Sequence, residues 1–243
     1  MKFAVRTNIG LRHDNEDSYL VPSGDTAVSL FAVADGMGGS AAGDVASRIT
    51  VETLAEASQS FTPENPRGQL KSAVLHANSS VYRIANSDRK KHGMGSTVVA
   101  AIVGKVGFLA ANVGDSRLYL FHDSELTQIT KDHSYVQMLV DAGEITPEEA
   151  RTHPQRNLIT QAIGIGIRTA VDLFEHEWSR GDLLLLCSDG LHGSVSSEEI
   201  ASILSKSLTL DEKCDALIAL ALKNGDTDNI TLILIENDGG ADE

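Results

Sequence analysis

The chain alternates between solid apolar runs and stretches in which apolar positions recur at helical spacing. The run 28–34 is almost wholly apolar and ends abruptly in Asp35 and a glycine-rich segment, which predicts a buried strand that opens into a turn. Apolar residues three and four positions apart then predict amphipathic helices over about 42–57 and 67–86. This part of the chain is therefore expected to form one strand followed by two helices.

Short β-rich runs follow in quick succession, at 96–103, 106–113, 117–121 and 126–129. Only a few residues separate them, which suits antiparallel hairpins, because a parallel crossover needs about a dozen residues or more. The later pattern adds strands at 171–178, 182–188 and 230–236 and helices at 197–205 and 211–223. Strand-rich stretches that alternate with pairs of amphipathic helices predict an α+β fold in which helices cover antiparallel sheets.

No internal repeat or low-complexity linker divides the sequence. We therefore expect a single domain over residues 1–236 and a frayed tail over 237–243. The segment 132–166 interrupts the strand pattern with short helical pieces and two prolines, which predicts an inserted excursion on the surface. Arg151 and Arg156 in this segment offer a second anion contact, whereas a variable surface loop explains the same residues nearly as well.

Charge and cysteine content narrow the classes of partner and compartment. Lys and Arg number 20 and Asp and Glu 34, so the net charge is −14, which disfavours nucleic acid and anionic membranes as partners. No stretch approaches the roughly 18 apolar residues of a transmembrane helix, and the N-terminus lacks the apolar core of a signal peptide. Cys187 and Cys214 lie far apart in apolar surroundings. These features predict a cytoplasmic protein with reduced thiols.

Several aspartates share one local setting. Asp35, Asp115 and Asp189 each follow a strongly apolar run and stand beside a glycine or a small polar residue, and Asp228 lies in a turn that leads into the last strand. Carboxylates at strand ends can converge at one edge of a sheet, where hard oxygen ligands bind Mg²⁺ or Mn²⁺. Each aspartate alone is better explained as a residue that starts a turn. Their shared setting favours a metal site.

A short loop near the N-terminus concentrates charge. Residues 12–17 place Arg12 in one short loop with Asp14 and two further acids, Glu16 and Asp17. An arginine side chain can grip a phosphate with two parallel hydrogen bonds, and nearby acids can bind water on a metal ion. A solvated charged loop explains the same residues equally well.

Eight short motifs follow one another along the chain: RHDNED at 12–17, VADGMGG at 33–39, MGST at 94–97, NVGDSR at 112–117, DHS at 132–134, HP at 153–154, CSDGL at 187–191 and DNIT at 228–231. In this order they resemble the motifs of bacterial serine/threonine phosphatases of the protein phosphatase 2C (metal-dependent PPM) type. The resemblance extends from about residue 8 to residue 235. A single Asp-Gly pair would be a weak signal, whereas eight motifs in order are a specific one.

The resemblance implies a fold and an activity. Members of this family fold as a central β-sandwich of two antiparallel sheets flanked by helices on both outer faces, in four αββα layers, with a mobile flap that 132–166 matches. They hydrolyse phosphoserine and phosphothreonine in proteins by direct attack of a hydroxide that bridges two Mn²⁺ or Mg²⁺ ions, without a phosphoenzyme. The implied partners are phosphorylated proteins, including a serine/threonine kinase and its substrates. A monomer is the default.

The resemblance also assigns roles to residues at the matching positions. Asp35, Asp189 and Asp228 would form the catalytic metal centre, with Asp35 bridging the two core ions. The main-chain carbonyl of Gly36 would help hold the first ion, and Asp189 with Asp228 the second. Asp115, together with Asp189, would hold a third, weaker ion.

Outside the direct ligands, Glu16 and Asp17 match acids that hydrogen-bond water on the metal ions, and Arg12 matches the arginine that grips the phosphate. Eukaryotic members carry a histidine, proposed as the general acid, where Met37 stands here. Water on the third ion is one substitute for that acid, with His13 or His133 as alternatives.

Two other functions remain open at this point. One is a catalytically weak relative that binds phosphoproteins as a regulator, which would be expected to have lost one of Asp35, Asp189 or Asp228, although all are present. The other is a hydrolase of small phosphate esters, which the same site would serve. A non-enzymatic metal-binding domain is the plainest alternative.

Overall fold

The computed structural model describes residues 1–22, 27–38 and 42–239, and its strands form two antiparallel sheets. The first sheet has the order β1-β11-β10-β7-β8, with bounds Lys2–Asn8, Ile230–Glu236, Leu183–Cys187, Arg117–His122 and Glu125–Gln128. The second has the order β2-β3-β5-β6-β9, with bounds Asp17–Leu20, Ser29–Met37, Val98–Val103, Gly107–Val113 and Asp172–Glu177; β4 (Gly95–Ser96) pairs with β3.

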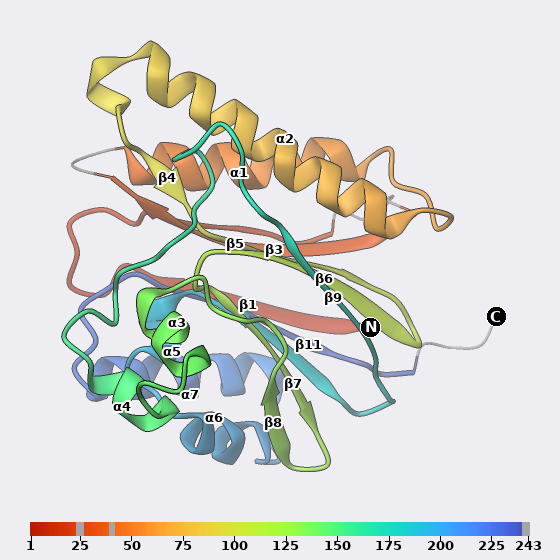
Figure 1. The fold of residues 1–243 in the computed structure, drawn as a ribbon. Coiled ribbons are helices and arrows are strands. Elements are labelled where there is room, and N and C mark those ends of the chain that lie inside the picture. The colour runs from red at the N-terminus through yellow and green to blue at the C-terminus, as the bar shows by residue number, and fades with distance from the viewer. Residues whose placement is uncertain (23–26, 39–41, 240–243) are drawn as a thin grey trace.

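Helices cover the outer face of each sheet, so that the molecule has four layers (Figure 1). Helices α1 (Gly43–Ser58) and α2 (Pro66–Ser87) lie over the second sheet, and a 3-10 turn, Arg89–Lys91, follows α2. Helices α6 (Ser197–Leu204) and α7 (Leu210–Lys223) lie over the first sheet. The α+β sandwich expected from the resemblance is confirmed.

The layering explains why strand β3 is apolar on both of its faces. Successive side chains of a strand point to opposite faces. Leu30 and Ala32 pack against the helices of the outer layer, whereas Phe31 and Val33 pack between the two sheets. Because each face of the strand lies against another layer, the sequence shows a continuous apolar run instead of an alternating one.

Four elements were not expected from the sequence pattern. Strands β1 and β2, the 3-10 turn Arg89–Lys91 and the one-turn helix α5 (Asp189–His192) all lie outside the predicted ranges. Strand β1 pairs with β11 over seven residues, from Lys2 opposite Glu236 to Asn8 opposite Ile230. Strand β2 pairs with β3 and so adds a strand to the edge of the second sheet.

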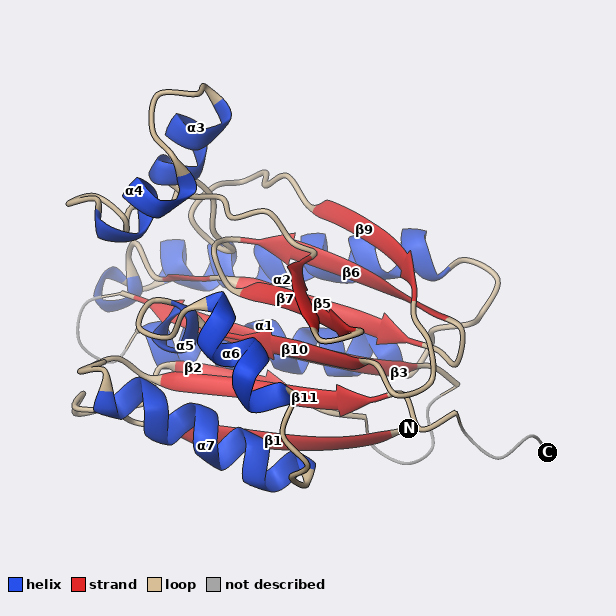
Figure 2. Ribbon diagram, turned by 90° about the horizontal axis from the view of Figure 1, so that it is seen from below, coloured by secondary structure: helices blue, strands red, loops and turns tan. Residues whose placement is uncertain are grey.

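The segment 132–166 carries two short helices, α3 (Tyr135–Asp141) and α4 (Pro147–Thr152). They project from one end of the sandwich (Figure 2). A capping box at Thr146 and Glu149 starts α4. Within the described part of the chain, no helix has the length and apolar character needed to cross a membrane.

The end of the chain differs in part from the expected frayed tail. Asn237 is buried, and its carbonyl accepts a hydrogen bond from the Gly181 amide at 2.7 Å, while its side chain donates to the Lys105 carbonyl at 3.1 Å. Residues 240–243 of that tail lie outside the described residues.

Candidate metal centre

Strand pairing brings Asp17 and Asp35 together. Asp17 is the register partner of Asp35 across β2 and β3, so both side chains lie on the same face of the sheet. The main chain of Asp35 is fixed on the other side by Thr97, whose hydroxyl accepts from the Asp35 amide at 3.0 Å and whose amide donates to the Asp35 carbonyl at 2.8 Å. The position of this carboxylate is therefore set by three adjacent strand segments.

Asp189 reaches the same place from the first sheet. It is the first residue of α5, directly after β10, and its side chain shares a hydrogen bond with that of Asp35. The preceding hydroxyl, that of Ser188, donates to Asp17 Oδ2 at 2.8 Å and accepts from the Thr231 amide at 3.0 Å. Ser188 therefore links the two sheets directly beneath the cluster.

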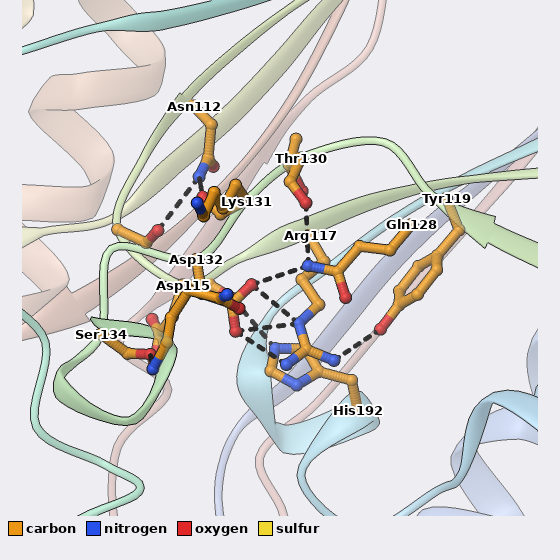
Figure 3. A network of polar contacts seen from close by, with 12 residues as sticks. Asn112, Asp115, Arg117, Tyr119, Gln128, Thr130, Lys131, Asp132, Ser134 and His192 are labelled. Atoms are coloured by element: carbon orange, nitrogen blue, oxygen red, sulfur yellow. Dashed lines mark hydrogen bonds and ion pairs between the residues drawn. The ribbon is translucent and has the colours of Figure 1, made fainter. Parts of the chain in front are cut away.

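Asp115 lies in the turn between β6 and β7, and two histidines hold this turn, of which His192 is seen in Figure 3. His133 accepts from the Gly114 amide at 3.2 Å through Nδ1 and donates to the Gly114 carbonyl at 2.9 Å through its own amide. His192, at the end of α5, donates from Nε2 to the Asp115 carbonyl at 3.0 Å. Helix α5 thus carries Asp189 at its first residue and positions Asp115 with its last.

Burial and mutual repulsion raise the pKa values of these carboxyls. Burial, and then the charges of Asp17 and Asp189, raise the pKa of Asp35 well above its ordinary value. Burial is also the largest cause for the others, whose pKa values rise to about 7 for Asp17, about 6 for Asp189 and about 8 for Asp115. Buried acids that repel one another are stabilised in their charged form by nearby cations.

The arrangement of the carboxylates fits divalent cations, although it is not yet a closed set of ligands around one point. No three His, Cys, Asp or Glu side chains among residues 1–22, 27–38 and 42–239 already form a cage that would hold an ion. Two buried carboxylate oxygens, Asp17 Oδ1 and Asp189 Oδ1, nevertheless have no hydrogen-bond partner. A buried acceptor without a donor is costly, and a hard cation satisfies such an oxygen.

Arg12 and Asp228 border the cluster and contact each other. Arg12 donates from Nη2 to Asp228 Oδ2 at 2.7 Å, and the two side chains are 54% and 39% exposed. Asp228 adjoins Asn229, whose side chain accepts from the Glu16 amide at 2.8 Å, and the charge of Asp228 contributes to the raised pKa values of Asp189 and Asp17. The pKa of Glu16 is raised mainly by burial, and a hydrogen bond from the Gly43 amide offsets part of this rise. The structure therefore brings together all of the predicted side chains.

Gly36 lies where the chain has no room for a side chain. A Cβ atom at this position would be 2.1 Å from the carbonyl oxygen of Gly43 and 2.6 Å from that of Glu16. The Gly36 amide donates to the Glu16 carbonyl at 3.1 Å. Glycine thus allows the loop that bears Glu16, strand β3 and the start of α1 to meet beside Asp35.

Sequence reasoning missed the residues that support the cluster. Ser188 and His192 act through contacts with segments that are far away in the sequence, and no local sequence pattern predicts such contacts. The alternative of His133 as a proton donor is unfavourable, because His133 is buried and its Nε2 already donates to Asp172 at 3.1 Å. Cys187 and Cys214 are buried and unpaired, and burial raises the pKa of each thiol to about 12, which makes them poor nucleophiles.

Comparisons with known proteins agree with this arrangement. A model of the protein phosphatase 2C family matches residues 8–223. The serine/threonine phosphatase Stp of Listeria monocytogenes is 41% identical over 243 residues, which cover 98% of this chain and 96% of that protein. The crystal structure of the serine/threonine phosphatase Stp1 from Staphylococcus aureus has a TM-score of 0.92 and 38% identity, over 97% of this chain and 94% of that one. The catalytic domain of the phosphatase PstP, solved with two manganese ions, has a TM-score of 0.86 and 39% identity, over 97% of each chain.

Proposed function

This chain belongs to the protein phosphatase 2C family, and we propose that its carboxylate cluster is the centre at which it hydrolyses phosphoserine and phosphothreonine in proteins. The chain is a metal-dependent protein serine/threonine phosphatase. The observation that carries the assignment of the site is the convergence of Asp17, Asp35, Asp115 and Asp189 from both sheets, with two buried oxygens that lack a donor. The competing functions have no comparable observation in their favour.

Phosphatases of this family use Mn²⁺ or Mg²⁺, which when bound neutralise negative charge and activate water for attack on phosphorus. Asp35, the Gly36 carbonyl, Asp189 and Asp228 would hold two core ions. Asp115 with Asp189 would hold a third, weaker ion. In this assignment Asp35 and Asp189 are central because their carboxylates lie against each other and come from different sheets.

The other charged groups of the site would orient the reactants. Glu16 and Asp17 would accept hydrogen bonds from water on the metal ions and so fix its direction of attack. Arg12 uses one N–H group on Asp228, so its remaining donors can bind phosphate oxygens. The exposed position of Arg12 at the rim suits a group that meets the phosphate as the substrate arrives.

Replacing Arg12 by Ala is expected to raise KM for a phosphothreonine peptide by about tenfold, with a smaller change in kcat, because a charged contact to the bound phosphate is lost. Arg12→Lys should restore only part of the effect, since an ammonium cannot make two parallel hydrogen bonds. Steady-state kinetics at saturating Mn²⁺ measure both constants. An unchanged KM in Arg12→Ala would contradict the phosphate-binding role.

Wider assignments follow from the same proposal. Residues 1–236 would form one catalytic domain, because both sheets share the apolar layer between them, and 132–166 would be a flap beside the site. The substrates are phosphorylated proteins, and a serine/threonine kinase and its substrates would be among them. The unpaired cysteines support a cytoplasmic location. A monomer is the simplest state.

Comparing substrates tests the proposed function. With Mn²⁺ present, the protein is expected to hydrolyse a phosphothreonine peptide with a kcat/KM at least about tenfold above that for small phosphate metabolites, because the peptide can use binding groups outside the cluster. Release of inorganic phosphate measures both rates. Hydrolysis of the metabolites alone would indicate a small-ester hydrolase, and a folded, Mn²⁺-loaded protein that binds phosphopeptide without turnover would indicate a regulator.

A further inference from the structure

A cavity of about 320 Å³ opens directly beside the cluster, between the helices of the segment 132–166 and the body of the sandwich. Its wall on one side comes from α3 and α4, including Val140, Pro147 and Arg151. On the other side it is lined by Asp115 and Asp189 and by residues around α5. Its volume is at the lower end of the roughly 300–1,000 Å³ of small-ligand pockets, which suits one side chain of a longer substrate.

The cations of this cavity outnumber the acids that are free to neutralise them. Arg117 is matched by Asp132, which accepts from its Nη2 at 2.7 Å and from its Nε at 2.9 Å (Figure 3). Asp115 and Asp189 belong to the cluster that binds metal ions in the proposed function. Two further arginines, Arg151 and Arg156, therefore remain without an acidic counterpart in the cavity wall.

Arg151 and Arg156 are available for contact with a ligand. Both residues are exposed, and neither side chain forms a hydrogen bond or a close ion pair among the described residues; Arg151 attracts the exposed Glu198 of α6 only at longer range. Arg151 is held at the last turn of α4, whose first turn is fixed by the capping box, so its guanidinium has a defined point of attachment over the cavity. By contrast, Arg6, Arg12 and Arg117 are all paired with aspartates.

The positive charge of Arg151 and Arg156 is opposite in sign to the net charge of the molecule. A protein with a net charge of −14 repels acidic peptides at long range. Unpaired guanidinium groups beside the reaction centre reverse this field locally, and guanidinium is well shaped to bind carboxylate or phosphate oxygens. A positively charged wall next to a phosphate-binding centre favours substrates with an additional anionic group near the phosphorylated residue.

We propose that this cavity is a specificity subsite, which receives an acidic side chain close to the phosphorylated residue of the substrate protein and binds it mainly through Arg151. The inference rests on the proposed phosphatase function and names a substrate class for it. Asp or Glu is the expected occupant, and a second phosphorylated residue at the same position shares the chemistry.

Matched phosphothreonine peptides that carry Glu, Gln, Lys or a second phosphothreonine beside the scissile residue test the subsite at saturating Mn²⁺. For the natural protein, kcat/KM for the Glu peptide should exceed that for the Gln peptide by about fivefold or more, mostly through KM, as expected for a partly exposed charge contact. The doubly phosphorylated peptide shows by its own KM whether phosphate or carboxylate is preferred. Separate peptides with the charge before or after the phosphothreonine fix the direction of the chain.

Variants assign the effect to Arg151. Arg151→Ala should bring the Glu-to-Gln ratio close to one, and Arg151→Glu should favour the Lys peptide. Arg83→Ala, which removes an exposed arginine from α2 on the far outer layer, should keep the ratio of the natural protein. Comparing peptides within each variant removes any general loss of activity from the result.

Two outcomes would overturn the subsite. The first is equal kcat/KM for the Glu, Gln and Lys peptides in the natural protein, and the second is a Glu preference that persists in Arg151→Ala and Arg151→Glu. Failure of the phosphatase function looks different, because the natural protein would then hydrolyse none of the peptides.

Discussion

Replacement of Asp35 by Asn is expected to lower the turnover of a phosphothreonine peptide by at least about 10³-fold at saturating Mn²⁺. Asp35 is partly buried at the centre of the cluster, lies against Asp189 and is opposite Asp17. Asn has nearly the same shape, so the substitution removes a charged ligand and leaves the packing almost intact. The effect should appear in kcat and not in KM, because the lost group acts on the reaction centre.

The binding of Mn²⁺ separates this effect from misfolding. Asp35→Asn should bind Mn²⁺ more weakly in calorimetry, while its metal-free melting temperature should equal or exceed that of the natural protein, because one source of buried repulsion is gone. Asp211→Asn on α7 is a suitable control, since Asp211 is 66% exposed and far from the cluster. A near-normal rate for Asp35→Asn with Mn²⁺ present would show that the centre has been placed wrongly.

The metal-free protein is expected to become less stable as the pH rises from 5 to 8. Asp189, Asp17 and Asp115 have an ordinary pKa of 3.8, which the folded state raises to about 6, about 7 and about 8. Over this range the folded state binds more protons than the unfolded chain, so the free energy of unfolding falls with increasing pH. A decrease in melting temperature on the order of 5–10 °C is expected.

Thermal unfolding of chelator-treated protein at pH 5 and pH 8 measures this change. Saturating Mn²⁺ should reverse the trend, because the ions bind the deprotonated carboxylates and stabilise the folded state more strongly at higher pH. A metal-free melting temperature that rises between pH 5 and 8 would argue against the burial of these acids as a group.

The positions of most strands and helices could be predicted because each is buried in a defined layer. The leucine run of β10 is an example: Leu184 and Leu186 face the layer between the sheets, while Leu183 and Leu185 face the helices α6 and α7. A strand buried on both faces leaves a continuous apolar signal. Strand β2 has no such signal, because it lies at a sheet edge and its residues are only partly buried.

The candidate site could be predicted in its residue types but not in its contacts. Asp35, Asp115 and Asp189 stand out because each ends an apolar run. Their convergence depends on the pairing of β2 with β3 and on the bridge from Ser188 to Asp17, which join residues up to 171 positions apart. Strand register depends on contacts between distant segments, so a local stretch of sequence does not predict it. A resemblance to known motifs predicts the same contacts indirectly.

The pairing of β1 with β11 has a consequence for the synthesis of the protein. Among the described strands of its sheet, β1 pairs only with β11, which is synthesised after all the others in that sheet. The contact between Arg12 and Asp228, 216 positions apart, likewise closes only then. A nascent chain therefore holds β1 as an unpaired edge until β11 has been synthesised, and the site is completed in a single late step once these two segments have met.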